Sequence, residues 1–317
     1  IHGPPNSPGG RLMPCTTTSS GMTPGGRASQ FGESRCVAPR SRPVAGSTRN
    51  IGRRLRTCFP LLIGDNRAMQ RPRIYSPDTL RTGATQPLSA AATTHVTRVL
   101  RLTAGDPITL FDGTGIDYAA TIVAPSRKGV TVLIGAGQPV DRESPLQLTL
   151  LQGVSRGPRM DLVVQKATEL GVSVIQPVLT GRSVVRLDAE RSAARLQHWQ
   201  NIVISACEQC GRSVLPEVRQ PLELAPALTG LAIGTTGLML DPDGDLNLNE
   251  LPAECRHIAL AIGPEGGFTE SERLTLTQAG FGRLRLGPRI LRTETAPLAA
   301  LSILQYARGD LGRCRSI

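Results

Sequence analysis

The sequence predicts an α/β domain with a mostly parallel sheet, preceded by a smaller module built from short strands. From residue 146 onward, short apolar runs of strand length alternate with stretches of helical periodicity. Such alternation is typical of a parallel sheet covered by helices on both faces. Between residues 70 and 145, short strand patterns are separated by turn-forming residues. That arrangement is typical of a small barrel.

The first 68 residues differ in composition from the rest of the chain. They carry 10 Arg and only 2 acidic residues, so they hold +8 of the formal charge of +11. They are rich in Gly, Pro, Ser and Thr, and they cannot bury enough apolar surface to offset their chain entropy. We expect a disordered segment, or an upstream extension of a protein that starts at Met69. The Arg-rich, acid-poor composition is also compatible with a transit peptide.

Charge, apolar runs and cysteines narrow the class of protein. Residues 69–317 hold 26 basic and 23 acidic residues, so net charge alone is weak support for nucleic-acid binding. No run of about 18 apolar residues predicts a membrane span. The seven Cys are scattered, and only Cys207 and Cys210 form a CxxC pair. Without partner ligands this pair predicts neither a metal site nor a disulfide framework, and a reducing cytoplasm is the expected location.

The small module begins with a strand at residues 74–76. Residues 88–102 then have helical periodicity, which predicts one buried face formed by Leu88, Ala91 or Ala92, His95 or Val96, and Val99. Further strands are expected at residues 107–111, 118–123 and 130–134, because turn-like segments separate them.

Four basic residues of this module allow two interpretations. Arg98 and Arg101 are three residues apart and could share an exposed helical face with His95, and Arg73 lies near the first strand. Such a strip could bind phosphates. Charge alone favours an ordinary solvated helix face instead.

The larger domain opens with a buried strand at residues 146–151. A helix follows, with Met160, Val163 or Val164, Ala167 and Leu170 inward, and it closes at Gly171. A strand at 172–178 and a long helix capped by Asp188 come next. Arg156, Arg159 and Lys166 could line an RNA groove, because Arg159 and Lys166 share a helix face. An ordinary polar face is the alternative.

The C-terminal part contains strands that end in turns rich in Gly and Pro. One strand covers residues 237–240 and ends at Asp241-Pro242. Another covers 258–262, and the turn Gly263–Gly267 leads into a helix with a capping box, Thr269 and Glu272, that ends at Gly280. A third strand near residue 284 leads through a second such turn to the last helix. Thr293 or Thr295 is its expected N-cap, with Pro297 in its first turn.

Strand ends beside helix N-termini form a pocket suited to a polar ligand. Two ordinary strand-to-helix connections would give the same pattern. Neither the glycine pattern of a Rossmann dinucleotide site nor that of a P-loop is present.

Several separated motifs resemble one known family. They are GPEGGFTESE from Gly263, LGPRILRTETAPLAAL from Leu286, KATELG from Lys166, SACEQCGR from Ser205 and HVTRVLR from His95. The sequence resembles the RsmE family of SPOUT-superfamily RNA methyltransferases from about residue 73 to its end. The resemblance implies a PUA-like RNA-binding β-barrel at residues 69–143. It also implies a SPOUT-like α/β knot, a deep trefoil, at residues 144–317.

The resemblance also implies an activity. S-adenosylmethionine would donate a methyl group to N3 of a uridine in 16S ribosomal RNA of the small subunit, and the enzyme would be a cytoplasmic homodimer without a metal. The last helix is a candidate dimer interface, although burial inside its own domain would give the same apolar pattern.

Site residues carried over from the family fall into three groups. The cofactor would contact Leu240, Gly263, Pro264, Glu265, Gly267, Leu286, Gly287, Ile290, Leu291 and Thr293. RNA would contact Arg73, His95, Arg98, Arg101, Arg156, Arg159 and Lys166. Catalysis would use Glu294 as the general base, and Arg289 and Arg292 would stabilise an oxyanion or bind a phosphate.

Structural alternatives remain for some of these residues. Glu294 could instead stabilise the positive N-terminus of the last helix, and Arg292 could pair with Glu265. Glu169, Glu208 and Gln209 either organise the site or satisfy buried backbone groups. The sequence departs from the family pattern at three places: Asp241 stands where His is usual, Thr94 stands where a second His or an Asn is frequent, and Ser213-Val214-Leu215 stands where Asn-Arg is common.

Other functions also fit parts of the pattern. A SPOUT-type enzyme could act on transfer RNA, and a protein without catalysis could bind RNA or assist ribosome assembly. The barrel-first order and the intact Gly263–Gly267 turn favour the ribosomal RNA methyltransferase.

Overall fold

The computed structural model describes residues 71–126, 129–183, 188–252 and 254–312. All of them belong to one compact unit, Asp65–Ile317. The predictions for residues 1–68 lie outside the described part of the chain.

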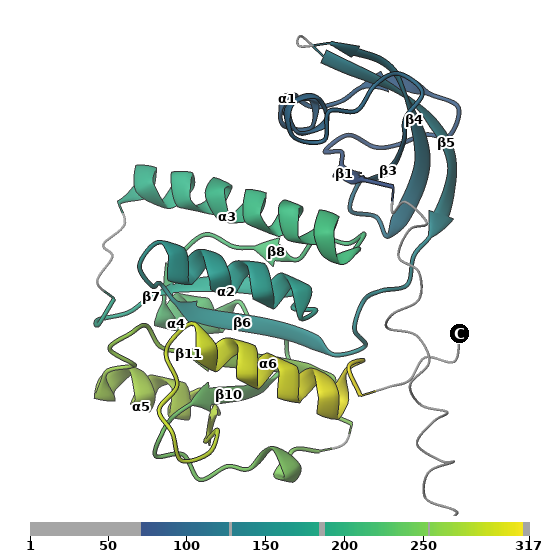
Figure 1. Ribbon diagram of the computed structural model, residues 1–317. Helices are drawn as coiled ribbons and strands as arrows, with labels where there is room; N and C mark the ends of the chain where they lie inside the picture. The colour runs from purple at the N-terminus through teal and green to yellow at the C-terminus, as the bar shows by residue number, and fades with distance from the viewer. Residues whose placement is uncertain (1–70, 127–128, 184–187, 253, 313–317) are drawn as a thin grey trace, which may run out of the picture. The chain divides into compact units, whose positions relative to one another are not determined.

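The first sheet has five strands and is barrel-like (Figure 1). Its order is β1 (Arg73–Tyr75), β3 (Pro107–Phe111), β4 (Ile116–Ser126), β5 (Gly129–Pro139) and β2 (Thr85–Pro87). β1 runs parallel to β3, and the other pairs are antiparallel. The register between β4 and β5 shifts twice, and such bulges increase the bend of a sheet. The four predicted strands are confirmed: β3 has the expected bounds, β1 begins and ends one residue earlier, and β4 and β5 extend further than expected. β2 was not predicted.

One short helical segment packs on this sheet. It consists of α1 (Ala90–Thr94) and a π-helical turn, η1 (His95–Val99). Leu88, Ala92 and Val96 are buried as predicted, but Val99 is 66% exposed. The prediction for Val99 was wrong because a π-helical turn has more residues per turn than an α-helix and rotates the following side chains away from the core.

The second sheet carries the larger domain and is entirely parallel. Its order is β12 (Gly282–Leu284), β10 (Thr236–Leu240), β11 (His257–Ile262), β6 (Gln147–Gly153), β7 (Val174–Leu179) and β8 (Glu217–Val218). The short strand β9 (Leu222–Glu223) also pairs with β7. All of these pairs are parallel. The predicted parallel sheet is therefore confirmed.

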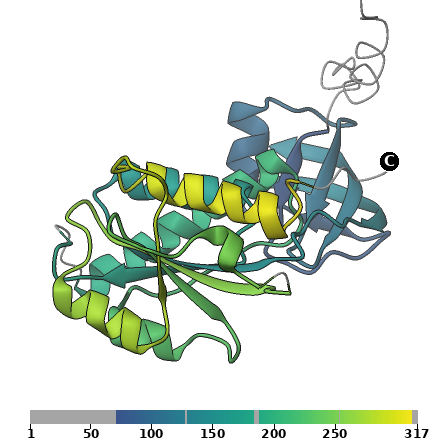
Figure 2. The ribbon, with the colours of Figure 1, turned by 90° about the horizontal axis from the view of Figure 1, so that it is seen from below.

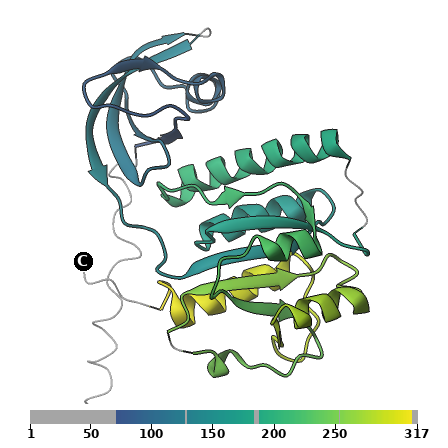
Figure 3. The ribbon, with the colours of Figure 1, turned by 180° about the vertical axis from the view of Figure 1, so that it is seen from behind.

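Helices cover both faces of the second sheet. On one face lie α2 (Pro158–Glu169), α3 (Ala189–Cys210) and α6 (Thr295–Arg308) (Figures 1 and 2). On the other face lie α4 (Leu224–Thr229) and α5 (Glu270–Gln278) (Figure 3). The 3-10 turn η2 (Leu248–Glu250) lies between β10 and β11.

Strand β11 shows why two cores form. Ile258, Leu260 and Ile262 belong to the apolar cluster that includes residues of α2, α3 and α6. Ala259 and Ala261 belong to the cluster that includes residues of α4 and α5. The period of two along a strand thus divides its side chains between the two layers.

Helix ends follow local rules at several places. Asp188 caps α3 by accepting the Arg191 N–H at 2.8 Å, and the capping box of α5 is present. α5 ends at Gln278. The Phe281 N–H reaches the Leu276 carbonyl and the Gly280 N–H reaches the Thr277 carbonyl, which is the Schellman arrangement that favours glycine at position 280.

The predicted N-cap of α6 is wrong. Glu294 occupies the N-cap position without a capping hydrogen bond from its side chain, and Thr295 is the first helical residue. The hydroxyl of Thr293 donates instead to the carbonyl of Gly263, thirty residues away. Pro297 lies in the first turn, as predicted.

Candidate functional site

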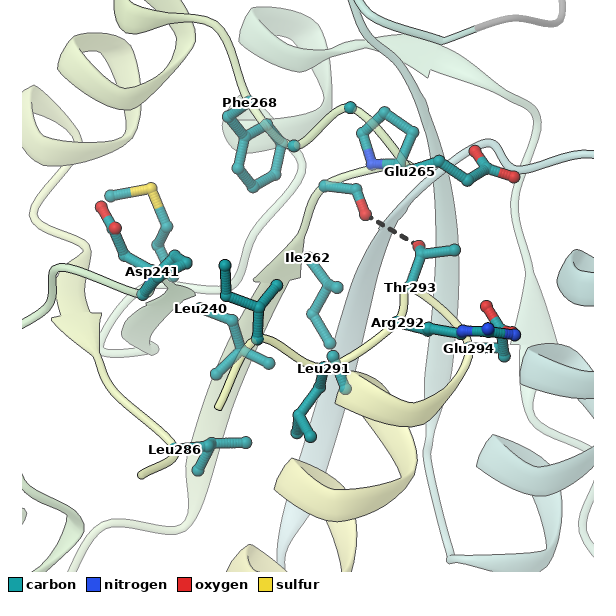
Figure 4. Close-up of a pocket in the computed structure, with 18 of the residues that line it drawn as sticks. Leu240, Asp241, Ile262, Glu265, Phe268, Leu286, Leu291, Arg292, Thr293 and Glu294 are labelled. Carbon is teal, nitrogen blue, oxygen red and sulfur yellow. Dashed lines mark hydrogen bonds between the residues drawn. The ribbon is translucent and has the colours of Figure 1, made fainter. Parts of the chain in front are cut away.

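A cavity of about 680 Å³ opens where β10, β11 and β12 end (Figure 4). The last residues of these strands, Leu240, Ile262 and Leu284, all line it. Ligands of open parallel sheets bind at the carboxyl ends of the strands. The cavity brings together all the predicted cofactor residues: Leu240, Gly263, Pro264, Glu265, Gly267, Leu286, Gly287, Ile290, Leu291 and Thr293.

The first wall of the cavity is the turn at residues 263–267. The Gly267 N–H donates to the Pro264 carbonyl at 2.8 Å. A Cβ on Gly263 would lie only 2.8 Å from the carbonyl carbon of Gly267, so a larger residue cannot be accommodated without movement of the turn. Arg182 holds the turn from outside, because its Nη1 donates to the carbonyls of Gly266 and Phe268 at 2.9 and 3.2 Å.

The second wall is the segment 285–294, which returns from the edge strand β12 to β11 and β6. Thr293 fixes its end. Its hydroxyl donates to the Gly263 carbonyl at 3.0 Å and lies 3.3 Å from the hydroxyl of Ser155 and 3.4 Å from Nε2 of Gln152. Gln152, Ser155 and Thr293 are all buried. The sequence does not mark Gln152 or Ser155 as site residues, because no local pattern shows which distant group a buried polar side chain will contact.

Three charged side chains meet at one end of the cavity. Arg159 Nη1 lies 2.8 Å from Glu265 Oε1, and Arg159 Nε lies 3.8 Å from Glu294 Oε2. Burial pushes the pKa of Glu265 upward, but hydrogen bonds from its own backbone N–H, Arg159 and the Arg156 N–H outweigh it and hold the pKa below its usual value. The described partner of Glu265 is therefore Arg159, and the alternative pairing with Arg292 is not observed. Arg289 and Arg292 line the cavity with exposed side chains.

Asp241 lies toward the opposite end (Figure 4). It is buried, and its Oδ2 lies 2.9 Å from Nε of Arg283 and 3.7 Å from Nη1 of Arg273. Its Oδ1 accepts the Asp243 N–H at 3.0 Å. Burial acts to raise the pKa of Asp241, but these partners lower it below the usual value. The departure from the family pattern thus has a local role, since the carboxylate holds the bend after β10 against β12.

The predicted RNA-contacting residues have different surroundings. Arg98, Arg101 and Arg156 are exposed, and His95 is half-buried. Arg101 lies beyond η1 with φ of +54°, so the expected helical face does not extend to it. Lys166 pairs with Glu169 at 2.7 Å, and Arg159 faces the cavity. Arg73 is enclosed by protein groups, with only 13% of its side chain exposed.

Glu208 accepts the Tyr75 N–H at 3.0 Å. This contact favours its backbone-satisfying role over a role in the site. Cys207 and Cys210 lie on α3, where the interaction with Cys207 lowers the pKa of the Cys210 thiol. Across the described residues, no group of three or more His, Cys, Asp or Glu could hold a metal ion. No helix of the described chain is long and apolar enough to span a bilayer.

Residues 142–305 match the family described as RNA methyltransferase domain, and residues 88–135 match the RNA methyltransferase PUA domain. The ribosomal RNA small subunit methyltransferase E of Buchnera aphidicola (Schizaphis graminum) is 35% identical over 240 residues, which is 76% of this chain and 98% of that protein. This chain belongs to the RsmE family. The corresponding Bacillus subtilis protein is 31% identical over 229 residues, or 68% of this chain and 89% of that protein.

Solved structures agree with this RsmE assignment. A Legionella pneumophila protein solved in complex with the bound cofactor SAM is 44% identical, with a TM-score of 0.74, and the match covers 76% of this chain and 99% of that one. The Neisseria gonorrhoeae ribosomal RNA small subunit methyltransferase E, bound to S-adenosyl methionine, is 41% identical, with a TM-score of 0.71 and coverage of 76% and 99%. The predicted fold, a SPOUT-like α/β knot preceded by a PUA-like barrel, is confirmed.

Proposed function

We propose that this RsmE-family protein uses S-adenosylmethionine to methylate N3 of a uridine in 16S ribosomal RNA. The observation that carries the proposal is the cavity between its two walls, the turn at residues 263–267 and the segment 285–294. Relatives that are 44% and 41% identical were solved with S-adenosylmethionine bound. Relatives named ribosomal RNA small subunit methyltransferase E support the RNA substrate.

The cavity suits this cofactor in size and chemistry. Its volume of about 680 Å³ lies within the range of small-molecule sites, about 300–1,000 Å³. Leu240, Leu286 and Leu291 offer apolar surface, while the backbone of residues 263–267 and 287 offers peptide groups. The absence of a side chain at Gly263 lets the turn close on itself, because a Cβ there would lie 2.8 Å from the carbonyl carbon of Gly267. When bound, S-adenosylmethionine supplies an electrophilic methyl group.

The remaining chemical problem is the proton on N3 of uridine, since N3 attacks well only after that proton leaves. Glu294 is the proposed base, because its carboxylate lines the cavity and its side chain is 18% exposed. Arg159 lies 3.8 Å from this carboxylate and orients it. Arg289 and Arg292 stabilise the negative charge that develops on the carbonyl oxygens of the uracil ring, or pair with RNA phosphates.

Further parts of the proposal concern assembly and RNA contact. Residues 69–143 form the RNA-binding barrel and residues 144–317 the catalytic domain, with His95, Arg98, Arg101 and Arg156 contacting RNA. α6 buries Leu301 and Leu304 in its own domain, yet Ile303 and Tyr306 are 43% and 72% exposed. This outward side supports a homodimer through α6. A protein that modifies ribosomal RNA is expected in the cytoplasm.

One assay tests the proposed function directly. Purified protein, S-adenosylmethionine and 16S ribosomal RNA are incubated, and methylated nucleotides are mapped by mass spectrometry. We expect one uridine to gain a methyl group at N3 and the protein's melting temperature to rise with cofactor. Methylation of transfer RNA alone, or of ribose, would refute the proposed target. No thermal shift together with no methyl incorporation would refute the enzyme.

A further inference from the structure

Arg73 of β1 lies at the centre of a polar cluster that joins the barrel-like sheet to the catalytic domain. Its Nη1 pairs with Oδ2 of Asp117 on β4. Its Nη2 donates to the Arg212 carbonyl and to the Ser213 hydroxyl, both at 3.1 Å. The Ser213 hydroxyl donates in turn to Asp117 Oδ1 at 2.5 Å. The guanidinium also lies 4.7 Å above the Phe111 ring.

The loop that receives these bonds is itself fixed in the catalytic domain. Nη1 of Arg212 donates to the carbonyls of Thr168 and Val172, both at 2.9 Å, and its Nε and Nη2 bond Glu143. Only 6% of the Arg212 side chain is exposed. The loop Gly211–Ser213 is therefore a rigid platform anchored at the ends of α2 and α3.

Backbone N–H groups of the barrel-like module also bond to the platform and to α3. The Gly115 N–H donates to the Ser213 carbonyl at 3.1 Å, and the Tyr75 N–H donates to Glu208 Oε1 at 3.0 Å. Arg73 and Tyr75 both belong to β1. The three contacts together fix the barrel against α3 and its following loop.

We propose that Arg73 is a positioning residue that holds the RNA-binding barrel at a set distance from the methyl-transfer cavity, and that it is not a phosphate ligand. This inference rests on the proposed function. Both terminal nitrogens of the guanidinium are used within the protein, and Nε is buried. Release of the guanidinium toward RNA would leave Asp117, 16% exposed, without its cation, and an unpaired buried charge is strongly unfavourable.

The consequence for catalysis follows from geometry. RNA held by the barrel must present one base to the cavity, and a misplacement of about 1 Å can lower a rate by about 100-fold. Loosening the cluster should therefore reduce methyl transfer while the cofactor site, formed by other residues, stays intact.

The test compares Arg73→Lys, Asp117→Asn, Ser213→Ala and the double variant Arg73→Met/Asp117→Leu. The double variant removes both charges together, so no buried charge is left unpaired and folding is expected to survive. We expect kcat/KM for RNA to fall by about 10- to 100-fold in the double variant, and less in Ser213→Ala. The dissociation constant for S-adenosylmethionine should stay unchanged.

The RNA affinity measured at several salt concentrations distinguishes a positioning role of Arg73 from a phosphate contact. Loss of one phosphate contact lowers the slope of log K against log salt by about 0.7–0.9. We expect this loss for the exposed Arg98→Ala and none for the Arg73 variants. Asp117→Asn separates the two roles as well, because a phosphate-binding Arg73 freed from Asp117 would bind RNA more tightly. Arg191→Ala, which breaks an exposed pair with Asp188, is the matched control and should change neither the salt slope nor the RNA affinity.

A reduced salt slope in the Arg73 variants, tighter RNA binding by Asp117→Asn, or full activity of the double variant would each overturn the inference. If wild-type protein binds RNA but transfers no methyl group, the proposed function fails instead. The salt slopes then still decide whether Arg73 contacts phosphate.

Discussion

Gly153 is a position outside the cavity lining at which one added methyl group should push on two residues of that lining, Gly263 and Pro264. It ends β6 and does not line the cavity. A Cβ at this position would lie 2.5 Å from the nitrogen of Pro264, 2.6 Å from its Cδ and 2.9 Å from the carbonyl carbon of Gly263. All three atoms belong to the start of the first wall, the turn at residues 263–267, so Gly153→Ala pushes directly on it.

The size of the effect can be worked from these distances. Ordinary contact begins near 3.4 Å, so the Pro264 nitrogen has to move by about 0.9 Å. Overpacking of this kind costs about 1–3 kcal/mol. If the whole cost falls on the form that binds cofactor, the dissociation constant for S-adenosylmethionine rises by about 5- to 150-fold.

Calorimetric titration with S-adenosylmethionine measures this change, and thermal melts without cofactor measure the stability lost by the fold. Gly230→Ala is the matched control, because its Cβ would meet its nearest described neighbour at 3.6 Å and its φ is −82°. That variant should bind cofactor like the wild type. A Gly153→Ala protein with unchanged cofactor affinity and unchanged melting temperature would refute the close approach of Gly153 to Gly263 and Pro264.

Three further substitutions test other parts of the site. Thr293→Val leaves the partly buried Gly263 carbonyl without its donor and should lower the stability measured in thermal melts by about 1–3 kcal/mol. Thr293→Ser keeps the hydroxyl and should retain most of the wild-type stability. Glu294→Gln should lower kcat by about 10²- to 10⁴-fold with cofactor affinity retained if Glu294 is the base; near-normal methylation would exclude that role. The pKa of Asp241 is depressed in the fold, so its stabilisation is present above the ordinary value of 3.8 and is lost as pH falls through the lower folded value. The difference in melting temperature between wild type and Asp241→Asn should therefore be large at neutral pH and small in acid. A difference that does not change with pH would contradict the ion pairs of Asp241.

Local signals in the sequence were sufficient for most of the fold. The capping box at Thr269, the cap at Asp188 and the glycine after α5 are formed by bonds within a few residues, so short-range rules apply to them. The buried parallel strands were predictable because their apolar runs are continuous. β2 was missed because three residues, Thr85–Pro87, give no readable alternation.

The errors at the site have a common cause, which is competition between a local and a distant partner. Thr293 was predicted to cap α6, but its hydroxyl bonds Gly263 instead. The contacts of Arg159 with Glu265 and Glu294 at the cavity were not predicted either, and its predicted contact with RNA stays a prediction. Residue type and spacing do not encode which distant group will lie within reach, so these partners could not be derived from the sequence.

The glycines explain why a knotted site is only partly visible in a sequence. A Cβ on Gly263 would meet the backbone of Gly267, one on Gly153 the backbone of Pro264, and one on Gly244 the carbonyl oxygen of Arg283 at 2.5 Å. In each case main chain passes directly against main chain. Gly263 stands in a dense Gly-Pro turn and was recognised, whereas Gly153 and Gly244 resemble ordinary loop glycines. A chain that kept every motif but carried alanine at positions 153 and 244 should therefore keep its strands and helices and lose the cavity that they enclose.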